Sequence, residues 1–272
     1  MGEAISEQLI GEGPVLLSLE NHVARLRLNR PQQSNGISIA LLEALHRAVM
    51  ACHGDPRIRA VLLTGEGPNF CAGGDVKEFA AKGEGLPDFL RKATSYLQIS
   101  AAGLVHLDAP VVVAVQGYAT GGGGLGLVCA ADIAIAAQSS KFMAGMTRVG
   151  MAPDAGISVT LPRMIGFRRA MDMILSNRIV DAQEALEMGL VSRVVPDSDL
   201  EQAALALAHQ LAAGAPRAAA AAKRLLWNGL GLGIDACLPE EARTVSELSG
   251  TTDSREGLAA VIERRKPNFV GR

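Results

Sequence analysis

The fold is decided by the stretch Ala114-Val115-Gln116-Gly117-Tyr118-Ala119-Thr120-Gly121-Gly122-Gly123-Gly124-Leu125-Gly126-Leu127. The run Pro110–Val115 is apolar and has the length of a buried strand, whereas the residues after the glycines are typical of a helix. Glycines let the backbone come close to a ligand, and the first N–H groups of a helix face outward at its positive end. A strand that runs through glycines into a helix therefore predicts an α/β protein with a site for negative charge at the junction.

A second glycine-rich turn precedes it, at Leu62-Leu63-Thr64-Gly65-Glu66-Gly67-Pro68-Asn69-Phe70-Cys71-Ala72-Gly73-Gly74-Asp75. It follows the buried strand predicted at Ala60–Gly65. Two such turns brought together could bind one developing oxyanion, although each turn alone fits plain packing equally well. No Gly-Lys-Ser/Thr follows the glycines, so the sequence does not favour a phosphate-binding loop. A GxGxxG motif with a suitably placed acidic residue is also missing, so it gives little support to a dinucleotide-binding site.

The N-terminal third predicts a hairpin and a helix. The runs Val15–Leu19 and Val23–Leu28 flank a short polar turn, which indicates a β-hairpin. Ser38 is placed to cap a helix that continues to about His53. The charged, glycine-containing segment 81–90 is expected to be a mobile loop, followed by a helix through Val105.

The remaining elements continue the alternation of strands and helices, which favours parallel pairing. A strand is predicted at Asp132–Ala136, a helix from Asp181 to Gly189 and a strand at Val191–Val195. Beyond about residue 198 the pattern is helical throughout. We therefore divide the chain into a core at 1–197 and a helical C-terminal region at 198–272.

Composition excludes several classes of protein. The chain has 272 residues, 49% of them hydrophobic, and a net charge of −2, which favours neither a nucleic-acid nor a membrane-surface binder. No apolar run approaches the length of a membrane span, and Met1–Gly13 lacks the layout of a signal peptide. The scattered cysteines suit a reduced cytoplasmic compartment better than disulfides or a zinc site. These cysteines are Cys52, Cys71, Cys129 and Cys237.

Taken together, the motifs resemble the crotonase (enoyl-CoA hydratase/isomerase) superfamily over nearly the whole chain. Asn29-Arg30-Pro31 with Asn35 is similar to the opening motif of the family, and Phe70–Asp75 to its first oxyanion-hole turn. Gln116–Ala119 with the glycines is similar to the second turn. Further matches are Ala185-Leu186-Glu187-Met188-Gly189-Leu190-Val191 and Lys266-Pro267-Asn268-Phe269.

The resemblance implies a spiral core of ββα units, a C-terminal helical module for oligomerisation, and trimers that often pair into hexamers. It implies acyl-CoA thioesters as substrates, with coenzyme A as part of the substrate and no separate cofactor or metal. The thioester oxygen would be held by two backbone N–H groups, one of them from Gly74. Counting back from Asp132 selects Gly123 for the other, whereas counting forward from Gly117 selects Gly122. We prefer Gly123, because the helix N-terminus should set the geometry.

Substrate contacts are expected around these donors. Ala72 matches the position that contacts the adenine in the family, and Gly73 and Gly122 flank the donors. Met146 and Met151 belong to a methionine-rich stretch that would form an adaptable acyl pocket or plain packing.

The residues that would carry hydration are missing. Hydratases of the family use two glutamates, but this chain has no glutamate between Glu84 and Glu184. Gly126 (or Leu125) and Met146 occupy the two expected positions. Neither glycine nor methionine can activate water or donate a proton, so ordinary two-glutamate hydration is not expected.

Asp154 is the remaining acid near the predicted site. From local sequence it fits a helix N-cap as well as a catalytic base. The resemblance favours the base, because Asp154 coincides with the aspartate of phenylacetate-pathway enoyl-CoA isomerases, dienoyl-CoA isomerases and a chlorobenzoyl-CoA dehalogenase. The latter two also need a glutamate or tryptophan where this chain has Met146. The single acid predicts a 3-enoyl-CoA to 2-enoyl-CoA isomerase, and apolar surroundings should raise the pKa of Asp154.

Several other residues and functions stay open. Asp75 and Asp132 are expected to be caps or ion-pair members. Arg148 could contact a carboxylated substrate or be a solvated surface residue. The basic tail residues Arg264–Lys266 could contact CoA phosphates or only solvent. A hydratase that uses Asp154 alone, or an acyl-CoA binder without catalysis, are the alternative functions.

Overall fold

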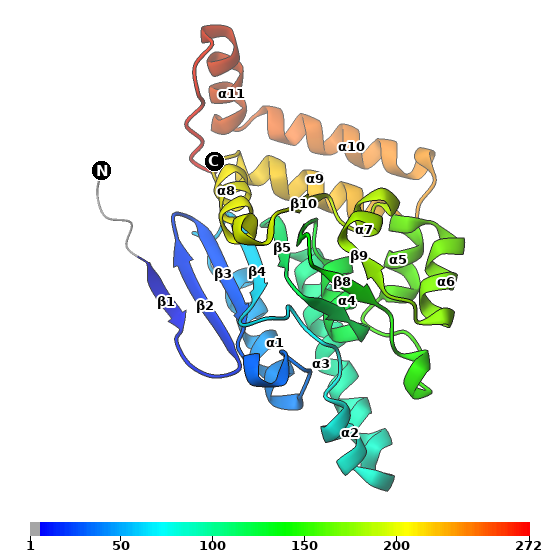
Figure 1. Ribbon diagram of the computed structural model, residues 1–272. Coiled ribbons are helices and arrows are strands. Elements are labelled where there is room, and N and C mark those ends of the chain that lie inside the picture. Colours follow the sequence, from blue (N-terminus) through cyan, green and yellow to red (C-terminus); the bar gives the residue numbers. More distant parts are fainter. Residues whose placement is uncertain (1–5) are drawn as a thin grey trace.

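The computed structural model describes residues 6–272 (Figure 1). The first five residues of the predicted core, and of the segment Met1–Gly13, lie outside the described part. A seven-stranded sheet runs through the core in the order β1-β2-β3-β4-β5-β7-β10. The strands are β1 (Glu7–Ile10), β2 (Val15–Glu20), β3 (Val23–Leu28), β4 (Ala60–Gly65), β5 (Val111–Val115), β7 (Ile133–Ala137) and β10 (Arg193–Val195).

The sheet combines an antiparallel edge with a parallel centre. Strands β1, β2 and β3 pair antiparallel, which confirms the predicted hairpin. From β3 through β4, β5 and β7 to β10 every pair is parallel, as the alternation of strands and helices predicted. Asn21 and His22 both have positive φ angles, 48° and 66°, as expected for the tight turn that joins β2 to β3.

Side chains alternate between two hydrophobic layers. Val61 and Leu63 of β4 face the larger core, whereas Ala60 and Leu62 face a smaller core covered by α8 (Leu200–Ala212). The larger core is completed by α1 (Ile39–Gly54), α3 (Leu86–His106) and α4 (Gly121–Ala130). Because both faces are covered, the central strands β4 and β5 carry continuous runs of buried apolar residues, which is why the sequence identifies them.

A second, three-stranded sheet was not predicted. It pairs β6 (Tyr118–Thr120) with β8 (Lys141–Met143) and β8 with β9 (Val180–Asp181). These strands have only two or three residues each, too short for a periodic pattern. The sheet matters for function because β6 leads directly into α4 and so fixes the start of that helix.

The predicted mobile loop at 81–90 is wrong. The short helix α2 (Val76–Ala81) is followed by a single 3₁₀ turn at Gly83–Gly85, and α3 begins at Leu86. Pro87 lies in the first turn of α3, where its fixed φ angle favours a helix start and its missing N–H is not needed. The two helices expected here and after Ser38 are otherwise confirmed, with the Ser38 hydroxyl accepting from the Leu41 N–H at 3.2 Å.

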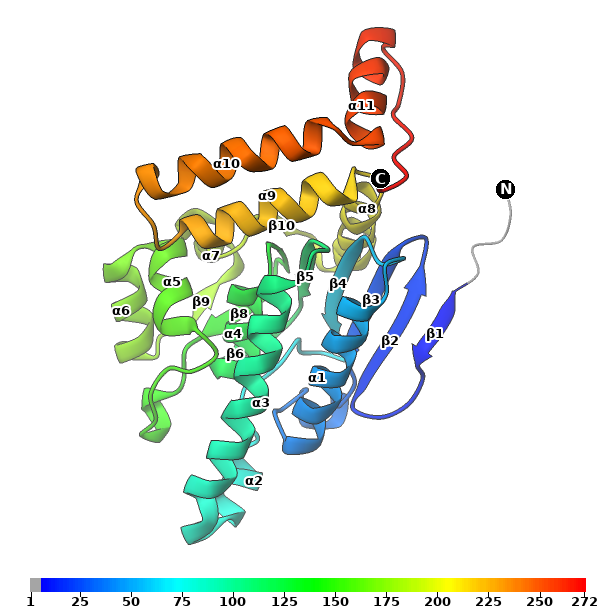
Figure 2. The same cartoon turned by 180° about the vertical axis from the view of Figure 1, so that it is seen from behind.

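Helices form the rest of the chain. Residues 157–188 contain α5 (Ile157–Ile165), α6 (Phe167–Ser176) and α7 (Ala182–Met188), the last capped by Asp181 and ended by Gly189 as predicted. After α8 come α9 (Pro216–Gly229), α10 (Ile234–Ser249) and α11 (Thr252–Glu263). In Figure 2, α9 and α10 lie side by side above the core, and α11 projects beyond them. The C-terminal helical region is thus present, although α8 itself packs on the sheet.

None of the helices in residues 6–272 combines the length and apolar character that a membrane crossing needs.

Candidate active site

The two glycine turns are hydrogen-bonded to each other. The Cys71 N–H donates to the Tyr118 carbonyl at 3.0 Å, and the Thr120 N–H donates to the Cys71 carbonyl at 3.0 Å. On the other side, the Ile37 N–H donates to the Gly73 carbonyl at 2.7 Å. The first turn is therefore held between β6 and the segment before α1, as the prediction of one joint site requires.

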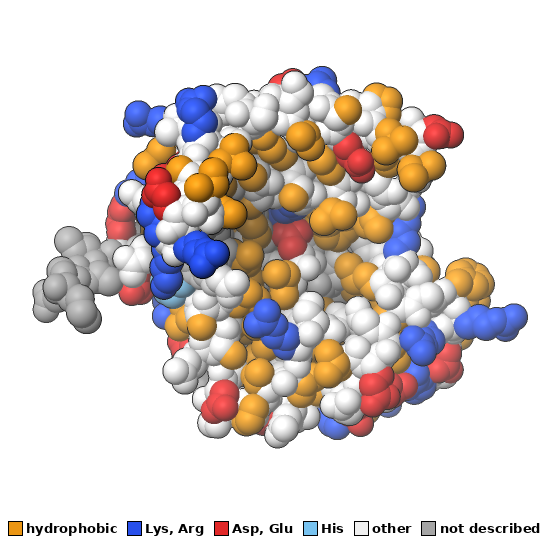
Figure 3. All heavy atoms as spheres, turned by 90° about the horizontal axis from the view of Figure 1, so that it is seen from above, with side chains coloured by type: hydrophobic (Ala, Val, Ile, Leu, Met, Phe, Trp, Pro, Cys, Tyr) orange, Lys and Arg blue, Asp and Glu red, His pale blue; other side chains and the backbone are white. Residues whose placement is uncertain are grey.

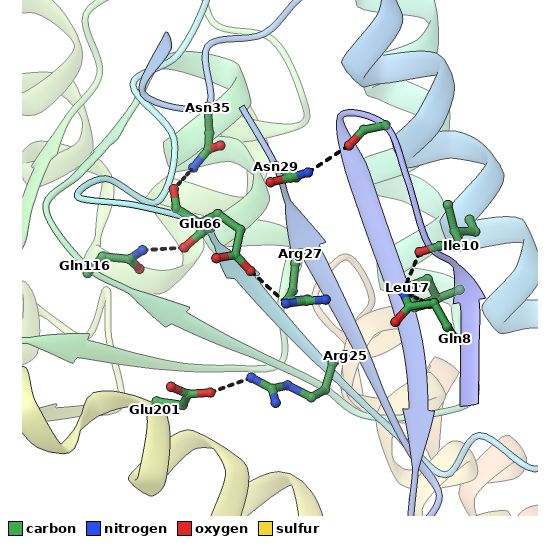
Figure 4. Close-up of polar contacts among 12 residues, drawn as sticks. Gln8, Ile10, Leu17, Arg25, Arg27, Asn29, Asn35, Glu66, Gln116 and Glu201 are labelled. Atoms are coloured by element: carbon green, nitrogen blue, oxygen red, sulfur yellow. Dashed lines mark hydrogen bonds and ion pairs between the residues drawn. The ribbon is translucent and has the colours of Figure 1, made fainter. Parts of the chain in front are cut away.

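Asn35 shapes the first turn from inside. The residue is fully buried, and its side-chain amide donates to the carbonyls of Glu66, Asn69 and Phe70 at 2.9, 2.8 and 3.0 Å. Its side-chain oxygen accepts from the Arg30 N–H at 2.8 Å. Figure 4 shows Asn35 and Gln116 converging on this turn, with Glu66 paired to Arg27 beside them. Asn35 therefore acts as a structural residue that fixes the backbone leading to Gly74.

Each of the two turns contains backbone N–H groups that have no hydrogen-bond partner within residues 6–272. The bridge to Ile37 uses the Gly73 carbonyl and the Asp75 N–H, so within residues 6–272 no hydrogen bond uses the Gly74 N–H. The first three residues of α4 likewise have N–H groups that no helical carbonyl can reach. The two turns come close together at Gly73. This glycine has φ +86°, and a β-carbon there would lie 2.9 Å from the Thr120 carbonyl oxygen.

The helix start adds a residue that the sequence did not single out. α4 begins at Gly121, so Gly121, Gly122 and Gly123 all belong to its first turn. All three line the cavity, and Gly121 borders the first turn, since its β-carbon would be 3.4 Å from the Gly73 Cα. The extra glycine that made the counting ambiguous is the signal that could have identified it. The choice between Gly123 and Gly122 as donor stays a prediction.

A cavity of about 590 Å³ opens between these turns. The proposed substrate contacts Ala72, Gly73, Gly122, Met146 and Met151 all line it. Phe79 of α2 and Leu97 of α3 form part of its wall, and the Phe79 ring packs on Gly74, where a β-carbon would lie 2.5 Å from it. Because the wall is largely apolar, the cavity suits a hydrocarbon chain whose reactive end meets the glycine N–H groups.

Asp154 projects into this cavity beside Gly122. A β-carbon on Gly122 would lie only 1.7 Å from the Asp154 Oδ1 atom, so the carboxylate packs directly on that glycine. The α5 helix is capped by Gly156 without any side-chain bond, which rules out the alternative that Asp154 is the N-cap. Oδ1 is buried and has no hydrogen-bond partner within the described residues.

Burial raises the pKa of the Asp154 carboxyl, and a hydrogen bond with its own backbone offsets this only in part. The direction agrees with the expectation from the apolar surroundings. A carboxylate whose loss of solvation outweighs its hydrogen bonding is more basic, which is what proton abstraction next to a carbonyl requires.

At the two positions where hydratases of the family have glutamates, this chain has Gly126 and Met146, which have packing roles. Gly126 faces away from the cavity lining, and a β-carbon there would lie 2.6 Å from the Ala155 Cβ. Met146 is 7% exposed and lines the cavity. Because Gly126 has no side chain, the segment after Asp154 can lie against α4. Within residues 6–272 no second carboxylate lines the cavity.

Other predicted residues have structural roles. Asp75 caps α2 by accepting from the Glu78 N–H at 3.1 Å. Asp132 accepts from the Val111 N–H at 2.7 Å and pairs with Lys223 at 2.8 Å. Arg265 pairs with Glu256 and Glu263, so its charge is already balanced within the tail. Burial raises the pKa of the Cys71 thiol to about 12, so this neighbour of the turn is no nucleophile.

Comparisons with known proteins agree with this fold. The profile of the enoyl-CoA hydratase/isomerase family matches residues 18–272. A probable enoyl-CoA hydratase of Rhodobacter capsulatus is 41% identical over 92% of this chain and 95% of its own length. The trans-2-decenoyl-[acyl-carrier-protein] isomerase of Streptococcus mutans is 32% identical over 95% of this chain and 98% of its own.

A crystal structure of an enoyl-CoA hydratase from Bacillus anthracis superposes with a TM-score of 0.88 at 35% identity, covering 98% of this chain and all of the other. The chain is therefore an acyl-CoA enzyme of crotonase fold. It belongs to the enoyl-CoA hydratase/isomerase family, which confirms the resemblance of its sequence motifs.

The contact between Gly122 and Asp154 predicts that a methyl group cannot be tolerated there. Gly122→Ala must displace the Asp154 carboxylate, and a displacement of about 1 Å is enough to lower kcat/KM by about 100-fold or more. Steady-state kinetics measure the loss. Gly54→Ala is the matched control, because a β-carbon on Gly54 meets no atom within 4 Å. Equal activities of the two variants would contradict the described geometry.

The raised pKa of Asp154 predicts an acidic limb in the pH profile. Only the ionised carboxyl can take a proton, so kcat/KM should fall as the pH decreases through its pKa. The limb is expected at a pH above about 3.9, the ordinary value of an aspartate. A profile that stays flat down to that value would show that Asp154 is not the base.

Proposed function

We propose that this enzyme isomerises a 3-enoyl-CoA to the conjugated 2-enoyl-CoA, with Asp154 as its single acid–base group. The observation that supports this most is the Asp154 carboxylate, which packs on the glycine turn in an apolar cavity without a hydrogen-bond partner for Oδ1. One carboxylate suffices, because the reaction moves one proton and releases nothing.

Each step can be assigned to a group of the chain. Asp154 removes a proton from the α-carbon, and the electron pair moves into the thioester, giving an enolate whose oxygen carries the charge. The N–H groups of Gly74 and Gly123, with Gly122 as the alternative, stabilise that oxygen, each contributing about 100- to 1000-fold in rate. The protonated carboxyl then returns the proton to the γ-carbon, and the double bond moves into conjugation. The reaction needs no cofactor beyond the coenzyme A of the substrate.

Hydration is the alternative that the names of the relatives support, since the first of them is called an enoyl-CoA hydratase. It needs one group to deprotonate water and one to protonate the α-carbon, whereas Asp154 is the one carboxylate lining the cavity within residues 6–272. The Streptococcus relative, named as an isomerase, supports double-bond movement. A non-catalytic acyl-CoA binder is a further alternative. It is disfavoured by Asp154, whose pKa is raised by burial and whose Oδ1 atom has no hydrogen-bond partner within residues 6–272.

An ultraviolet assay distinguishes these functions. Purified enzyme with 3-enoyl-CoA should give rising absorbance of the conjugated enoyl thioester. Falling absorbance with 2-enoyl-CoA and no reaction of 3-enoyl-CoA would instead establish hydration. Binding of both thioesters without turnover would indicate a binder.

We also propose that the C-terminal region assembles the enzyme into trimers or hexamers. Exposed large hydrophobic side chains lie on α9 and α11, with Leu226 74%, Val261 78% and Ile262 81% exposed. Hydrophobic side chains surround a hollow on the face seen from above, the side of α10 and α11 (Figure 3). Apolar groups this exposed on a single chain usually mark an interface.

Assembly predicts a molar mass three or six times the 28.3 kDa of one chain in light scattering. Ile262→Glu with Leu226→Glu should shift the mass toward one chain, because burying two carboxylates in an apolar interface is unfavourable. A wild-type mass of one chain would contradict the proposal.

A cytoplasmic location is proposed from the cysteines. Cys52, Cys71 and Cys129 are buried free thiols, and Cys237 is half-buried. Unpaired cysteines are usual where thiols are kept reduced.

A further inference from the structure

Two charged side chains line the cavity in the part of the chain that the structure describes, Asp154 and Arg148. Asp154 is used by the proposed reaction, whereas Arg148 has no assigned role. Arg148 is exposed at the cavity wall, and within residues 6–272 its guanidinium takes part in no ion pair or hydrogen bond.

The backbone that carries Arg148 is firmly held. Arg148 is the middle residue of the 3₁₀ turn Thr147–Val149, in which the Val149 N–H donates to the Met146 carbonyl at 3.1 Å. The Thr147 hydroxyl donates to the Ile174 carbonyl and accepts from the Asn177 amide, both at 2.7 Å. The Met151 N–H returns to the Met146 carbonyl at 3.0 Å. Arg148 therefore extends from a fixed turn whose neighbours Met146, Val149 and Met151 form the apolar wall.

We propose that Arg148 is a specificity residue that binds a negatively charged oxygen group of the acyl-CoA substrate. The inference rests on the proposed function in that the cavity is taken as the acyl-CoA site. An unpaired guanidinium beside an apolar wall can bind a carboxylate or phosphate by donating two parallel hydrogen bonds, while its other N–H groups stay hydrated. Two groups have that chemistry: a second carboxylate at the far end of the acyl chain, or a phosphate of coenzyme A.

Binding of unreactive, saturated thioesters tests this without any turnover, so a failed isomerase assay leaves the test intact. Calorimetry would compare hexanoyl-CoA, the adipoyl mono-thioester of CoA and hexanoyl-pantetheine, which has no nucleotide phosphates. With Arg148→Gln, a carboxylate contact predicts a Kd about tenfold weaker for adipoyl-CoA alone, in keeping with a partly exposed charged contact. A phosphate contact predicts the same loss for both CoA thioesters and none for hexanoyl-pantetheine.

Controls make either outcome specific. Arg148→Lys should restore part of the lost affinity, because it keeps the charge without the planar fork. Arg168→Gln removes an exposed arginine of α6 that does not line the cavity, and it should change none of the three affinities. The proposal is overturned if Arg148→Gln leaves all three affinities unchanged, or if it weakens hexanoyl-pantetheine as much as the others.

Discussion

Replacing Asp154 with asparagine is expected to abolish isomerisation while making the protein more stable. The substitution keeps the shape of the side chain beside Gly122 but removes the base. Loss of a general base typically costs about 100- to 10,000-fold in rate. The ultraviolet assay with 3-enoyl-CoA measures this loss directly.

The gain in stability follows from the same burial. A carboxyl whose pKa is raised in the folded state contributes stability at pH values below its unfolded pKa, and this contribution is lost as the pH rises through the folded pKa. At neutral pH the ionised Asp154 is therefore unfavourable, and Asp154→Asn removes that charge. We expect Tm to increase by roughly 2–4 °C, which corresponds to a gain of about 1 kcal/mol in the free energy of unfolding.

The control for this variant is Asp88→Asn, since the Asp88 side chain is 84% exposed. It should change neither activity nor Tm. Full activity of Asp154→Asn would refute the proposed base, and a lower Tm would contradict the inference that the buried carboxylate is unfavourable at neutral pH.

Replacing Lys223 with methionine should have the largest effect on folding stability. Lys223 is 7% exposed on α9, and its Nζ atom contacts the Asp132 carboxylate at 2.8 Å and the carbonyl of Leu104 at 2.8 Å. Asp132 also accepts from the Trp227 Nε1–H at 2.7 Å. This buried cluster ties α9 to the last turn of α3 and to the residue before β7.

Removing one member of a buried ion pair leaves the other charge uncompensated, so Lys223→Met should lower the free energy of unfolding by about 3–5 kcal/mol. Urea unfolding at a fixed protein concentration measures it. Trp227 is the one tryptophan of the chain, and its fluorescence reports on this cluster.

Two comparisons test the cause. The double variant Lys223→Met with Asp132→Asn should be less destabilised than the sum of the single variants, because neither charge remains. Lys266→Met removes an exposed lysine and should change stability by less than about 0.5 kcal/mol. A loss as small for Lys223→Met would contradict the assigned role of the pair.

The sequence predicted the central sheet because all of β5 and the first four residues of β4 are apolar and buried, on both faces of the sheet. Caps at Ser38 and Asp181 likewise follow from local chemistry. The sheet formed by β6, β8 and β9 could not be predicted, since its strands are short and pair across long separations. The prediction of a loop at 81–90 was wrong because it gave more weight to Gly83 and Gly85 than to Pro87, which is a signal for the start of a helix.

For the site, the motifs located both glycine turns and Asp154, but not the contact between them. The packing of Asp154 on Gly122 joins residues far apart in sequence, and it depends on where α4 begins. The role of Gly121 in that first turn required the structure for the same reason. For Arg148 the sequence left a substrate contact and a solvated surface residue open, and the structure places it on the cavity wall.

The transfer of one proton by Asp154 is tested most directly with 3-enoyl-CoA deuterated at the α-carbon. Early in the reaction, ²H NMR of the 2-enoyl-CoA product should show deuterium at the γ-carbon with wild-type enzyme, and no product should form with Asp154→Asn. A product with no deuterium at the γ-carbon, formed equally fast by Asp154→Asn, would contradict the single-carboxylate mechanism.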